Sequence, residues 1–388
     1  MDLGRLDFDN LGPEKILIVS DKKTGMKGWV VIDNTALGVG KGGIRMTPTI
    51  TIEEVARLAR AMTLKNSLAG LPFGGAKSGI LAPADVIKDP ARKKEYIVAF
   101  SKAIKSICPR EYVAGPDMNT GEEEMRWFVE ANGSWKAATG KPKGMCIGKD
   151  GKKCGIPHEY GSTGFGVCQA ALVGMDFKKM NVKETSFAVE GFGNVGYFAA
   201  KHMIEKGAKL VAISDSKGTL YNPEGINFQE LEKVKKETGS VINYKPGEIL
   251  KTSDLFELDV DILITAAVPD VINKDNVDKI RAKIIVEGSN IPTKPEYEEI
   301  LYKKGILVIP DFVANAGGVI SSYAEYKGKT PDEMFKIVEK KITSNVKKVL
   351  VLSRKEGIKP RDAAMKIALQ RIENKTNDNK NKNAGGGI

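Results

Sequence analysis

Histidine and cysteine are scarce in this chain of 388 residues, with two and four residues respectively. Two histidines are too few to form the histidine clusters that many metal-dependent mechanisms use. The sequence therefore argues against a metallohydrolase and predicts no metal site. So few cysteines in a long chain, with no CxxC pair, make no disulfide framework and suit a reducing compartment. Cys146 and Cys154 flank a lysine-rich loop that offers too few ligands for zinc. We therefore interpret Cys108, Cys146, Cys154 and Cys168 as ordinary thiols.

Long hydrophobic runs are also absent. No apolar run reaches the roughly 18 to 20 residues that cross a bilayer, and the acidic start, MDLGRLDFDN, lacks the apolar stretch of a signal peptide. The sequence therefore predicts a cytoplasmic protein without a membrane partner. Apolar residues make up 41% and charged residues 28%, which excludes collagen-like and disordered classes and allows two or three domains.

The net charge of +11 is unevenly distributed along the chain. From Lys341 to the end, twelve Lys and Arg face four Asp and Glu, so this stretch carries +8 of the total. Its last part, 375–388, is polar and rich in Asn, Lys and Gly, and is predicted to be a disordered tail. Because no aromatic residues lie between the basic ones, we expect no nucleic-acid partner.

The first part of the chain, 1–155, is predicted to form one α/β domain. The segments ILIVSD and GWVVID, with a turn-like KKTGMK between them, are typical of an antiparallel hairpin. Apolar residues then recur at spacings of three and four over 52–68, which predicts a helix with Thr51 as its cap. Glycine-rich loops lie on either side of this helix.

The second part, 156–344, alternates short apolar strands with helices. The strands are SFAVEGF, KLVAIS, DILITAA, KIIVEG and ILVIPD. This alternation predicts βαβ units and a parallel, Rossmann-like sheet. The amphipathic helices of about 345–374 are expected either to extend this domain or to pack back on the first.

A dinucleotide fingerprint follows the strand SFAVE. Gly191 permits a tight turn, Gly193 lets the backbone approach a pyrophosphate, and Gly196 allows close packing of helix and strand. Asn194 and Val195 complete the loop, whose helix N-terminus favours phosphate. The alternative, a tight turn in an unrelated doubly wound protein, fits this context less well.

The acid 19 residues after the third glycine is Asp215. A carboxylate there favours the 2′-hydroxyl of NAD, but Ser216 and Lys217 follow it and can instead receive the 2′-phosphate of NADP. The predicted cofactor is therefore NAD or NADP.

Three lysines lie in or beside glycine-rich segments of the first domain: Lys41, Lys65 and Lys77. Several ammonium groups around one cleft indicate an anionic substrate. Crowding and burial favour the neutral amine, so one of these lysines can act as an acid or base near neutral pH. Taken singly, each lysine is more often a solvated surface group.

Seven motifs in order give the sequence a specific resemblance. They are KGGIRM, MTLKNSLAGLPFGGAKSGI, AGPDMNTGEEEM, STGFGV, EGFGNVG, VEGSNIPT and PDFVANAGGV. From about Ile16 to Asn374 the chain resembles the glutamate/leucine/phenylalanine/valine dehydrogenases. The resemblance implies an N-terminal substrate and assembly domain, a Rossmann-like cofactor domain, an active site in the cleft between them, and oxidative deamination of an amino acid.

The same resemblance implies roles for individual residues. Lys65 is similar to the lysine that holds the substrate α-carboxylate. Lys77 matches the lysine that polarises the carbonyl and activates water, and Asp117 matches the carboxylate that moves protons. Thr163 and Asn290 match positions near the nicotinamide.

Two further positions predict the substrate. Family members that act on glutamate have a lysine in KGGxR and a serine seven residues after the asparagine of NAGGV, where the leucine and phenylalanine enzymes have apolar residues. Here these are Lys41 and Ser322, so L-glutamate, 2-oxoglutarate and ammonia are the expected partners. The alternatives are a leucine-, valine- or phenylalanine-type enzyme, favoured by the N-terminal region, and a non-catalytic dinucleotide sensor.

The resemblance also implies a homo-oligomer, namely a hexamer, and the N-terminal hairpin offers strand edges for pairing. The short N-terminal region and an unusual segment at 144–160 depart from the family pattern. Both departures concern the oligomeric state, because the resemblance implies that the N-terminal domain takes part in assembly.

Overall fold

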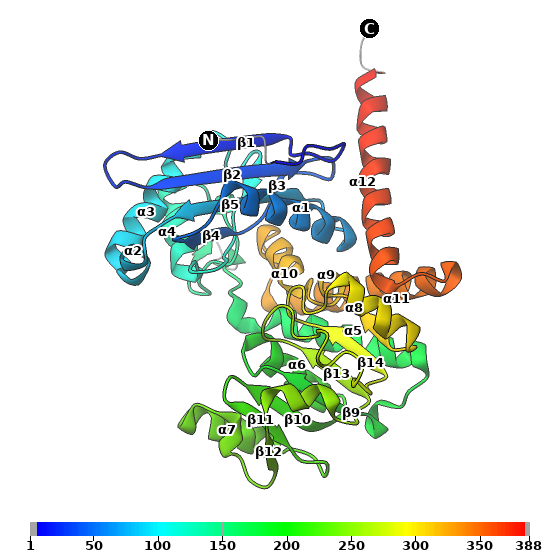
Figure 1. Ribbon diagram of the computed structural model, residues 1–388. Helices are drawn as coiled ribbons and strands as arrows, with labels where there is room; N and C mark the ends of the chain where they lie inside the picture. Colours follow the sequence, from blue (N-terminus) through cyan, green and yellow to red (C-terminus); the bar gives the residue numbers. More distant parts are fainter. Residues whose placement is uncertain (1–5, 149–150, 152, 385–388) are drawn as a thin grey trace. The chain divides into compact units, whose positions relative to one another are not determined.

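The computed structural model describes residues 6–148, 151 and 153–384, and divides into two compact units (Figure 1). The first unit comprises Met1–Tyr160, Val319–Met334 and Met365–Ile388, and the second comprises Gly161–Gly318 and Phe335–Ala364. The first boundary between the units follows Tyr160, whereas the sequence analysis placed a domain boundary after residue 155. Residues 319–334, which the sequence assigned to the second domain, belong to the first unit.

The first unit is built on a six-stranded sheet of order β1-β2-β5-β3-β6, with β4 beside β5. Its strands are β1 (Lys15–Ser20), β2 (Lys27–Asn34), β3 (Gly40–Lys41), β4 (Ile44–Thr47), β5 (Gly74–Leu81) and β6 (Tyr112–Val113). Its helices are α1 (Ile52–Leu68), α2 (Ala84–Lys88), α3 (Pro90–Ala103) and α4 (Glu122–Asn132). Strands β1 and β2 pair antiparallel, which confirms the predicted hairpin.

Helix α1 has the predicted bounds and the predicted cap. The side chain of Thr51 accepts a hydrogen bond from the backbone N–H of Glu54, and Glu53 and Glu54 place negative charge in the first turn. The apolar positions Ile52, Val55 and Ala59 are buried. This helix packs against β5 and thereby supports the strand that carries Lys77.

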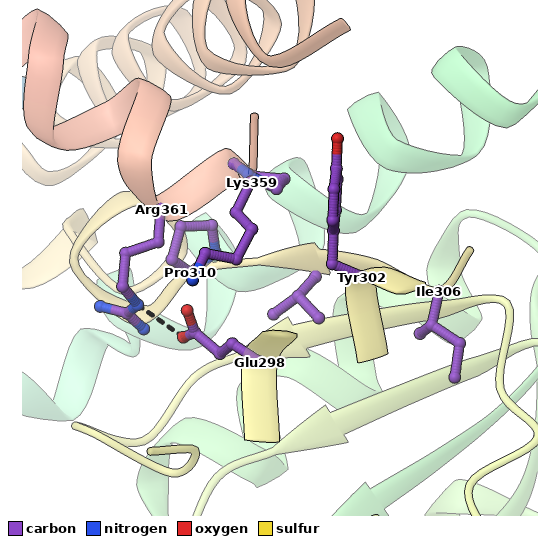
Figure 2. Close-up of a pocket in the computed structure, with 8 residues that line it drawn as sticks. Glu298, Tyr302, Ile306, Pro310, Lys359 and Arg361 are labelled. Carbon is purple, nitrogen blue, oxygen red and sulfur yellow. Dashed lines mark hydrogen bonds and ion pairs between the residues drawn. The ribbon is translucent and has the colours of Figure 1, made fainter. Parts of the chain in front are cut away.

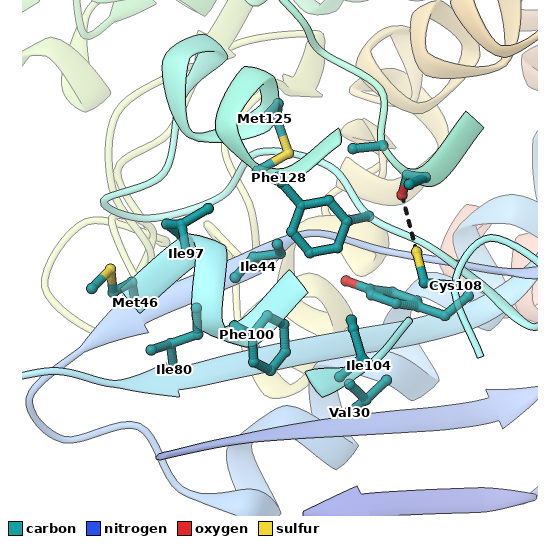
Figure 3. Close-up of a cluster of buried hydrophobic side chains, with 14 of the residues drawn as sticks. Val30, Ile44, Met46, Ile80, Ile97, Phe100, Ile104, Cys108, Met125 and Phe128 are labelled. Atoms are coloured by element: carbon teal, nitrogen blue, oxygen red, sulfur yellow. Dashed lines mark hydrogen bonds between the residues drawn. The ribbon is translucent and has the colours of Figure 1, made fainter. Parts of the chain in front are cut away.

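The core of the first unit lies between the sheet and helices α3 and α4 (Figure 3). Its largest buried side chains include Ile44, Met46, Phe100, Tyr112 and Phe128. Cys108 lies in this core as a free thiol whose Sγ contacts the carbonyl oxygen of Ala137 over 3.4 Å. Burial raises the pKa of this thiol to about 12, so Cys108 is a packing residue.

The second unit contains a seven-stranded sheet of order β12-β11-β10-β9-β13-β14-β15. Its strands are β9 (Ser186–Glu190), β10 (Lys209–Asp215), β11 (Gly218–Tyr221), β12 (Glu248–Leu250), β13 (Ile262–Thr265), β14 (Ile284–Glu287) and β15 (Leu307–Ile309). The five predicted strands are parallel and adjacent, as expected. Strands β11 and β12, which the sequence analysis missed, extend this sheet antiparallel at one edge.

The helices of the second unit are α5 (Ser162–Lys178), α6 (Asn194–Glu205), α7 (Phe228–Thr238), α8 (Pro295–Lys303) and α9 (Asp311–Ala314). Three further helices, α10 (Gly317–Tyr326), α11 (Pro331–Glu356) and α12 (Pro360–Ala384), carry the chain from one unit to the other. No helix within the described ranges is long and apolar enough to cross a membrane.

Helix α12 corrects the prediction of a disordered tail over 375–388. The helix continues to Ala384, and only 385–388 of the predicted tail lie outside the described residues. Within the first unit it is fixed to α1, because the hydroxyl of Ser67 donates to the carbonyl oxygen of Ala368 over 2.6 Å. Arg371 also donates to the carbonyl oxygens of Ser67 and Leu68. The last helix therefore packs back on the first unit from residue 365 onward.

The interpretation of all four cysteines as thiols is wrong for two of them. Cys146 and Cys154 form a disulfide that joins the two short antiparallel strands β7 (Cys146–Ile147) and β8 (Lys153–Cys154). A spacing of eight residues has no CxxC signature, and the two cysteines are brought together because they lie opposite each other in the register of β7 and β8. Cys108 and Cys168 are buried and free.

Candidate active site

Strands β3 and β5 place two of the predicted lysines on one face of the first sheet. Lys41 of β3 is opposite Gly75 of β5 in parallel register, and Lys77 lies two residues further along β5. Because side chains alternate between the two faces of a strand, Lys41 and Lys77 project to the same side. Both are buried, with 4% and 6% of their surface exposed.

Lys77 forms an ion pair with Asp117, which lies in the turn after β6. The backbone fixes that turn, because the N–H of Thr120 donates to the carbonyl oxygen of Asp117 over 2.9 Å and the N–H of Met118 donates to its Oδ1 over 2.6 Å. The structure thus brings together the two residues predicted to be catalytic, although they are 40 positions apart in the sequence.

Arg45 completes this group and was missed by the sequence analysis. Its Nε donates to Oδ1 of Asp117 over 3.0 Å, and its Nη1 pairs with Glu54 over 2.8 Å. Burial raises the pKa of Asp117, but the charges of Lys77 and Arg45 outweigh burial and hold this pKa below its usual value. The sequence contains a feature that could have identified this residue, because Arg45 is the arginine of the KGGIRM motif.

Lys41 has an unusual environment for a lysine. Its Nζ donates to the carbonyl oxygen of Ala114 over 2.8 Å. Burial lowers its pKa to about 7; the carboxylate of Glu325 opposes this shift, whereas Lys77 and Lys141 add to it. Lys41 therefore changes its charge in the neutral range, which the crowding of the lysines had suggested for at least one of them.

Ser322 is half-buried on α10, one helical turn before Glu325. Glu325 is fully buried and pairs with the buried Lys141 over 2.5 Å. The same carboxylate accepts from the N–H groups of Gly140 and Ile156 over 2.8 and 2.9 Å. These bonds fix α10, and with it Ser322, within the first unit. Neither Lys141 nor Glu325 was predicted.

Lys65 lies in the last turn of α1 and is half-buried. The next residue, Asn66, is buried and donates to the carbonyl oxygens of Gly74 over 2.7 Å and Lys41 over 3.4 Å. The end of α1 is therefore tied to the strands that carry Lys41 and Lys77, and the three predicted lysines come from adjoining elements of one unit.

The glycine-rich loop of the second unit connects β9 to α6, as the fingerprint predicts. Gly191 has φ +95°, a conformation that L-residues with side chains rarely adopt. A Cβ on Gly196 would clash with the carbonyl oxygen of Gly191, whereas one on Gly193 would meet nothing within 4 Å. Helix α6 therefore packs tightly on the strand and leaves open space at the turn, where Asn194 and Val195 begin the helix. These residues fit a dinucleotide pyrophosphate.

Asp215 ends β10, as expected, but its carboxylate is occupied by its own chain. It accepts from Lys235 Nζ over 2.7 Å, from the Ser240 hydroxyl over 2.9 Å, and from the N–H groups of Lys217 and Val241. Burial raises the pKa of Asp215, but these donors outweigh it and lower the pKa overall. This ionised carboxylate therefore fixes the segment after β10.

Thr163 and Asn290 lie at two further places in the second unit. Thr163 is in the first turn of α5 and is buried, with 8% of its surface exposed. Asn290 is exposed in the loop after β14, and its Oδ1 accepts from Asn315 Nδ2 over 3.0 Å. Since β9, β13 and β14 are parallel neighbours, this loop and the glycine-rich loop share the carboxyl edge of the sheet.

The fold and these residues define an enzyme with a dinucleotide-binding unit and a lysine-rich catalytic unit. A family model described as Glutamate/Leucine/Phenylalanine/Valine dehydrogenase matches residues 154–379, and one for the dimerisation domain of the Glu/Leu/Phe/Val dehydrogenases matches residues 13–133. The chain therefore belongs to the glutamate/leucine/phenylalanine/valine dehydrogenase family and is an NAD(P)-dependent amino acid dehydrogenase. The predicted family and two-domain α/β fold are confirmed.

Individual relatives cover most of the chain. A glutamate dehydrogenase of Aeropyrum pernix is 41% identical over 357 residues, which are 89% of this chain and 84% of that protein. An NADP-specific glutamate dehydrogenase of Saccharolobus shibatae is 38% identical, covering 83% and 78%. The crystal structure of the hetero-hexameric glutamate dehydrogenase of Thermus thermophilus, in its leucine-bound form, has a TM-score of 0.80 and 26% identity, covering 94% and 89%.

Proposed function

We propose that this chain is a glutamate dehydrogenase, which converts L-glutamate, NAD(P)⁺ and water into 2-oxoglutarate, ammonium, NAD(P)H and a proton. The observation that carries this proposal is the pair of buried lysines, Lys41 and Lys77, on one face of the first sheet with Asp117 beside them. Relatives 36–41% identical that are glutamate dehydrogenases support the same substrate.

The charge balance of the site favours a dicarboxylate. Lys77 and Arg45 pair with Asp117, and Arg45 is further balanced by Glu54. Lys41 adds a third basic group on the same face of the sheet. Among the residues that the structure describes, the acceptor for Lys41 Nζ is the backbone carbonyl of Ala114, so a side-chain carboxylate of the substrate would give it an ionic partner. With Ser322 as a second donor, Lys41 binds the distal carboxylate of glutamate, and Lys65 binds the α-carboxylate.

When bound next to Thr163 and Asn290, the nicotinamide would supply the acceptor for the hydride that leaves Cα of the amino acid. Lys77 then orients and activates the water that attacks the resulting iminium carbon, and its ammonium stabilises the oxygen of the tetrahedral adduct. Asp117, ionised and within reach of Lys77, takes the proton from the water and returns it to the departing amino group. The ion pair between them allows the proton to pass directly from one to the other.

The cofactor is NAD or NADP. In the proposal, the backbone N–H groups around Gly191, Gly193 and Gly196 bind its pyrophosphate at the start of α6, together with Asn194 and Val195. Thr163 and Asn290 contact the nicotinamide end. Asp215 shapes the ribose side of the site indirectly, by fixing the segment after β10 through the bonds of its carboxylate to its own chain. The NADP-specific relative of Saccharolobus shibatae makes both cofactors necessary in any assay.

The assembly and location of the protein belong to the same proposal. A homo-hexamer is supported by the match to a family dimerisation domain over 13–133 and by the hexameric relative of Thermus thermophilus. The cytoplasmic location predicted from the sequence stays a prediction.

The test is a spectrophotometric assay at 340 nm with the purified protein, each of the two cofactors, and glutamate, leucine, valine or phenylalanine in turn. Glutamate should give the highest kcat/KM. A preference for an apolar amino acid would assign the chain to the leucine- or phenylalanine-type enzymes. No turnover with any of them, despite cofactor binding, would make it a sensor.

A further inference from the structure

Arg361 is placed among three carboxylates in the second unit, and none of the sequence motifs contains it. It lies in the first turn of α12 with 23% of its side chain exposed. Its guanidinium donates to Glu298 over 2.5 Å, to Glu287 over 2.8 Å and to Asp311 over 2.9 Å. Figure 2 shows Arg361 facing Glu298 at one end of the pocket they line.

Two of these carboxylates connect Arg361 to the loop after β14. Glu287, the last residue of β14, accepts from the N–H of Asp311 over 3.0 Å. Asp311 in turn accepts from the N–H of Ile291 over 2.9 Å through the oxygen that Arg361 does not contact. A continuous path of hydrogen bonds therefore runs from Arg361 to the residue that follows Asn290.

The loop needs such support. Ile291 has φ +49°, a left-handed conformation that is unfavourable for a β-branched residue, and it persists only where surrounding bonds hold it. On the other side of the loop, Asn315 donates to Asn290 over 3.0 Å and to the carbonyl oxygen of Gly288 over 3.3 Å. Asp311 and Asn315 thus hold the loop from both ends.

The charges show why Arg361 is essential to this arrangement. Glu287 is fully buried, and Glu298 and Asp311 are nearly so. Burial raises the pKa of Glu287 to about 8; Arg361 opposes this, while Asp311 and Glu298 add to it. The guanidinium is the donor that these three buried carboxyl groups share, so its loss leaves them without that partner and releases Asp311 from its position.

We propose that Arg361 is a positioning residue for the cofactor, which acts through Glu287 and Asp311 to fix the loop at 288–291 and the side chain of Asn290. The inference rests on the proposed function, because it takes Asn290 as a contact of the nicotinamide end. Arg361 acts through its bonds to Glu287 and Asp311 and needs no contact with cofactor or substrate. It determines how much binding energy the cofactor loses in ordering this loop.

The first experiment replaces Arg361 with lysine, which keeps the charge but cannot bond three carboxylates at once. NADPH and NADH binding is measured by fluorescence titration without amino acid, alongside kcat, both KM values and the thermal midpoint. We expect about tenfold weaker binding and a tenfold higher cofactor KM, with kcat at saturation and KM for glutamate within twofold. Arg354→Lys, on α11 of the same unit, is the matched control and should leave all these values unchanged.

A second pair of variants keeps Arg361 and protects the test against a folding failure. Asp311→Asn removes the carboxylate that links Arg361 to Ile291, whereas Glu298→Gln removes one that has no bond to the loop in the described structure. Only Asp311→Asn should weaken cofactor binding. Equal weakening by both, or unchanged binding in Asp311→Asn and Arg361→Lys, would overturn the proposal.

A double-mutant cycle identifies the end point of the path. If Arg361 acts through Asn290, Arg361→Lys should add less than twofold to the loss of cofactor affinity caused by Asn290→Ala. Full additivity would contradict this route. Failure of the proposed function has a different signature, since a wild-type protein without turnover would still give the titration results above.

Discussion

Nε of Arg45 lies 3.0 Å from Oδ1 of Asp117, so the proposed proton carrier is held between two cations, since Lys77 pairs with its other oxygen. Arg45→Gln removes one of the charges that lower the pKa of Asp117. That pKa should rise, and because the ionised form accepts the proton, the acid limb of kcat/KM should move about one pH unit toward neutrality. The control is Arg57→Gln, on the exposed face of α1. If the acid limb of kcat/KM does not move in Arg45→Gln, then Asp117 is not the group whose ionisation sets that limb.

The pair of Lys77 and Asp117 predicts the effect of removing either partner. Lys77→Ala and Asp117→Asn should each lower kcat by roughly two to three orders of magnitude, the usual cost of losing an acid–base group. Cofactor binding should survive, because both residues belong to the first unit and the glycine-rich loop to the second. Lys88→Ala, at an exposed lysine of α2, serves as the control. Wild-type turnover in either variant removes that residue from the mechanism.

The sequence predicted those helices and strands whose formation depends on residues that are close together in the chain. The helix at 52–68 was predicted with its cap because Thr51 and the spacing of Ile52 and Val55 act within a few residues. The five parallel strands were predicted because buried strands are continuously apolar. Strands β11 and β12 were missed because they are short, lie at the sheet edge and have 26 residues between them.

Contacts between distant residues account for what the sequence did not predict. The motifs gave Lys77 and Asp117 as separate candidates, but only the fold shows that they form an ion pair beside Arg45. Arg361 has partners 50 to 74 positions away and belongs to no motif. The predicted tail was judged on its polarity, whereas the helix there continues from a part of α12 that is anchored on α1.

The disulfide predicts a thiol count. Protein purified without reductant and unfolded in the presence of Ellman's reagent should show two reactive thiols, Cys108 and Cys168, and prior reduction should raise the number to four. In the native state neither free thiol should react quickly, because burial raises the pKa of both to about 12. Four thiols without reduction would restore the interpretation from sequence.

The proposed hexamer predicts a mass in solution. Light scattering behind size exclusion at micromolar concentration should give about six times 42.1 kDa. The outer edge of β1, where Ile18 is 51% exposed, is the surface we expect to be covered by another subunit. Ile18→Lys should therefore shift the protein toward smaller species, whereas Lys22→Glu in the following turn should not. A monomeric wild-type protein contradicts the assembly.

The pKa of about 7 at Lys41 predicts that the preference for glutamate depends on pH. The distal carboxylate of glutamate needs the charged ammonium, whereas the side chain of norvaline does not. Since the free enzyme loses this proton as the pH rises through 7, the ratio of kcat/KM for glutamate to that for norvaline should fall at least tenfold between pH 7 and 9. The ratio cancels the ionisation of the catalytic groups and of the substrate amine, which both substrates share. The double variant Lys41→Leu with Ser322→Val should lose glutamate activity, gain norvaline activity and show a ratio that does not depend on pH. A ratio that does not change with pH in the wild-type protein would remove Lys41 from substrate recognition.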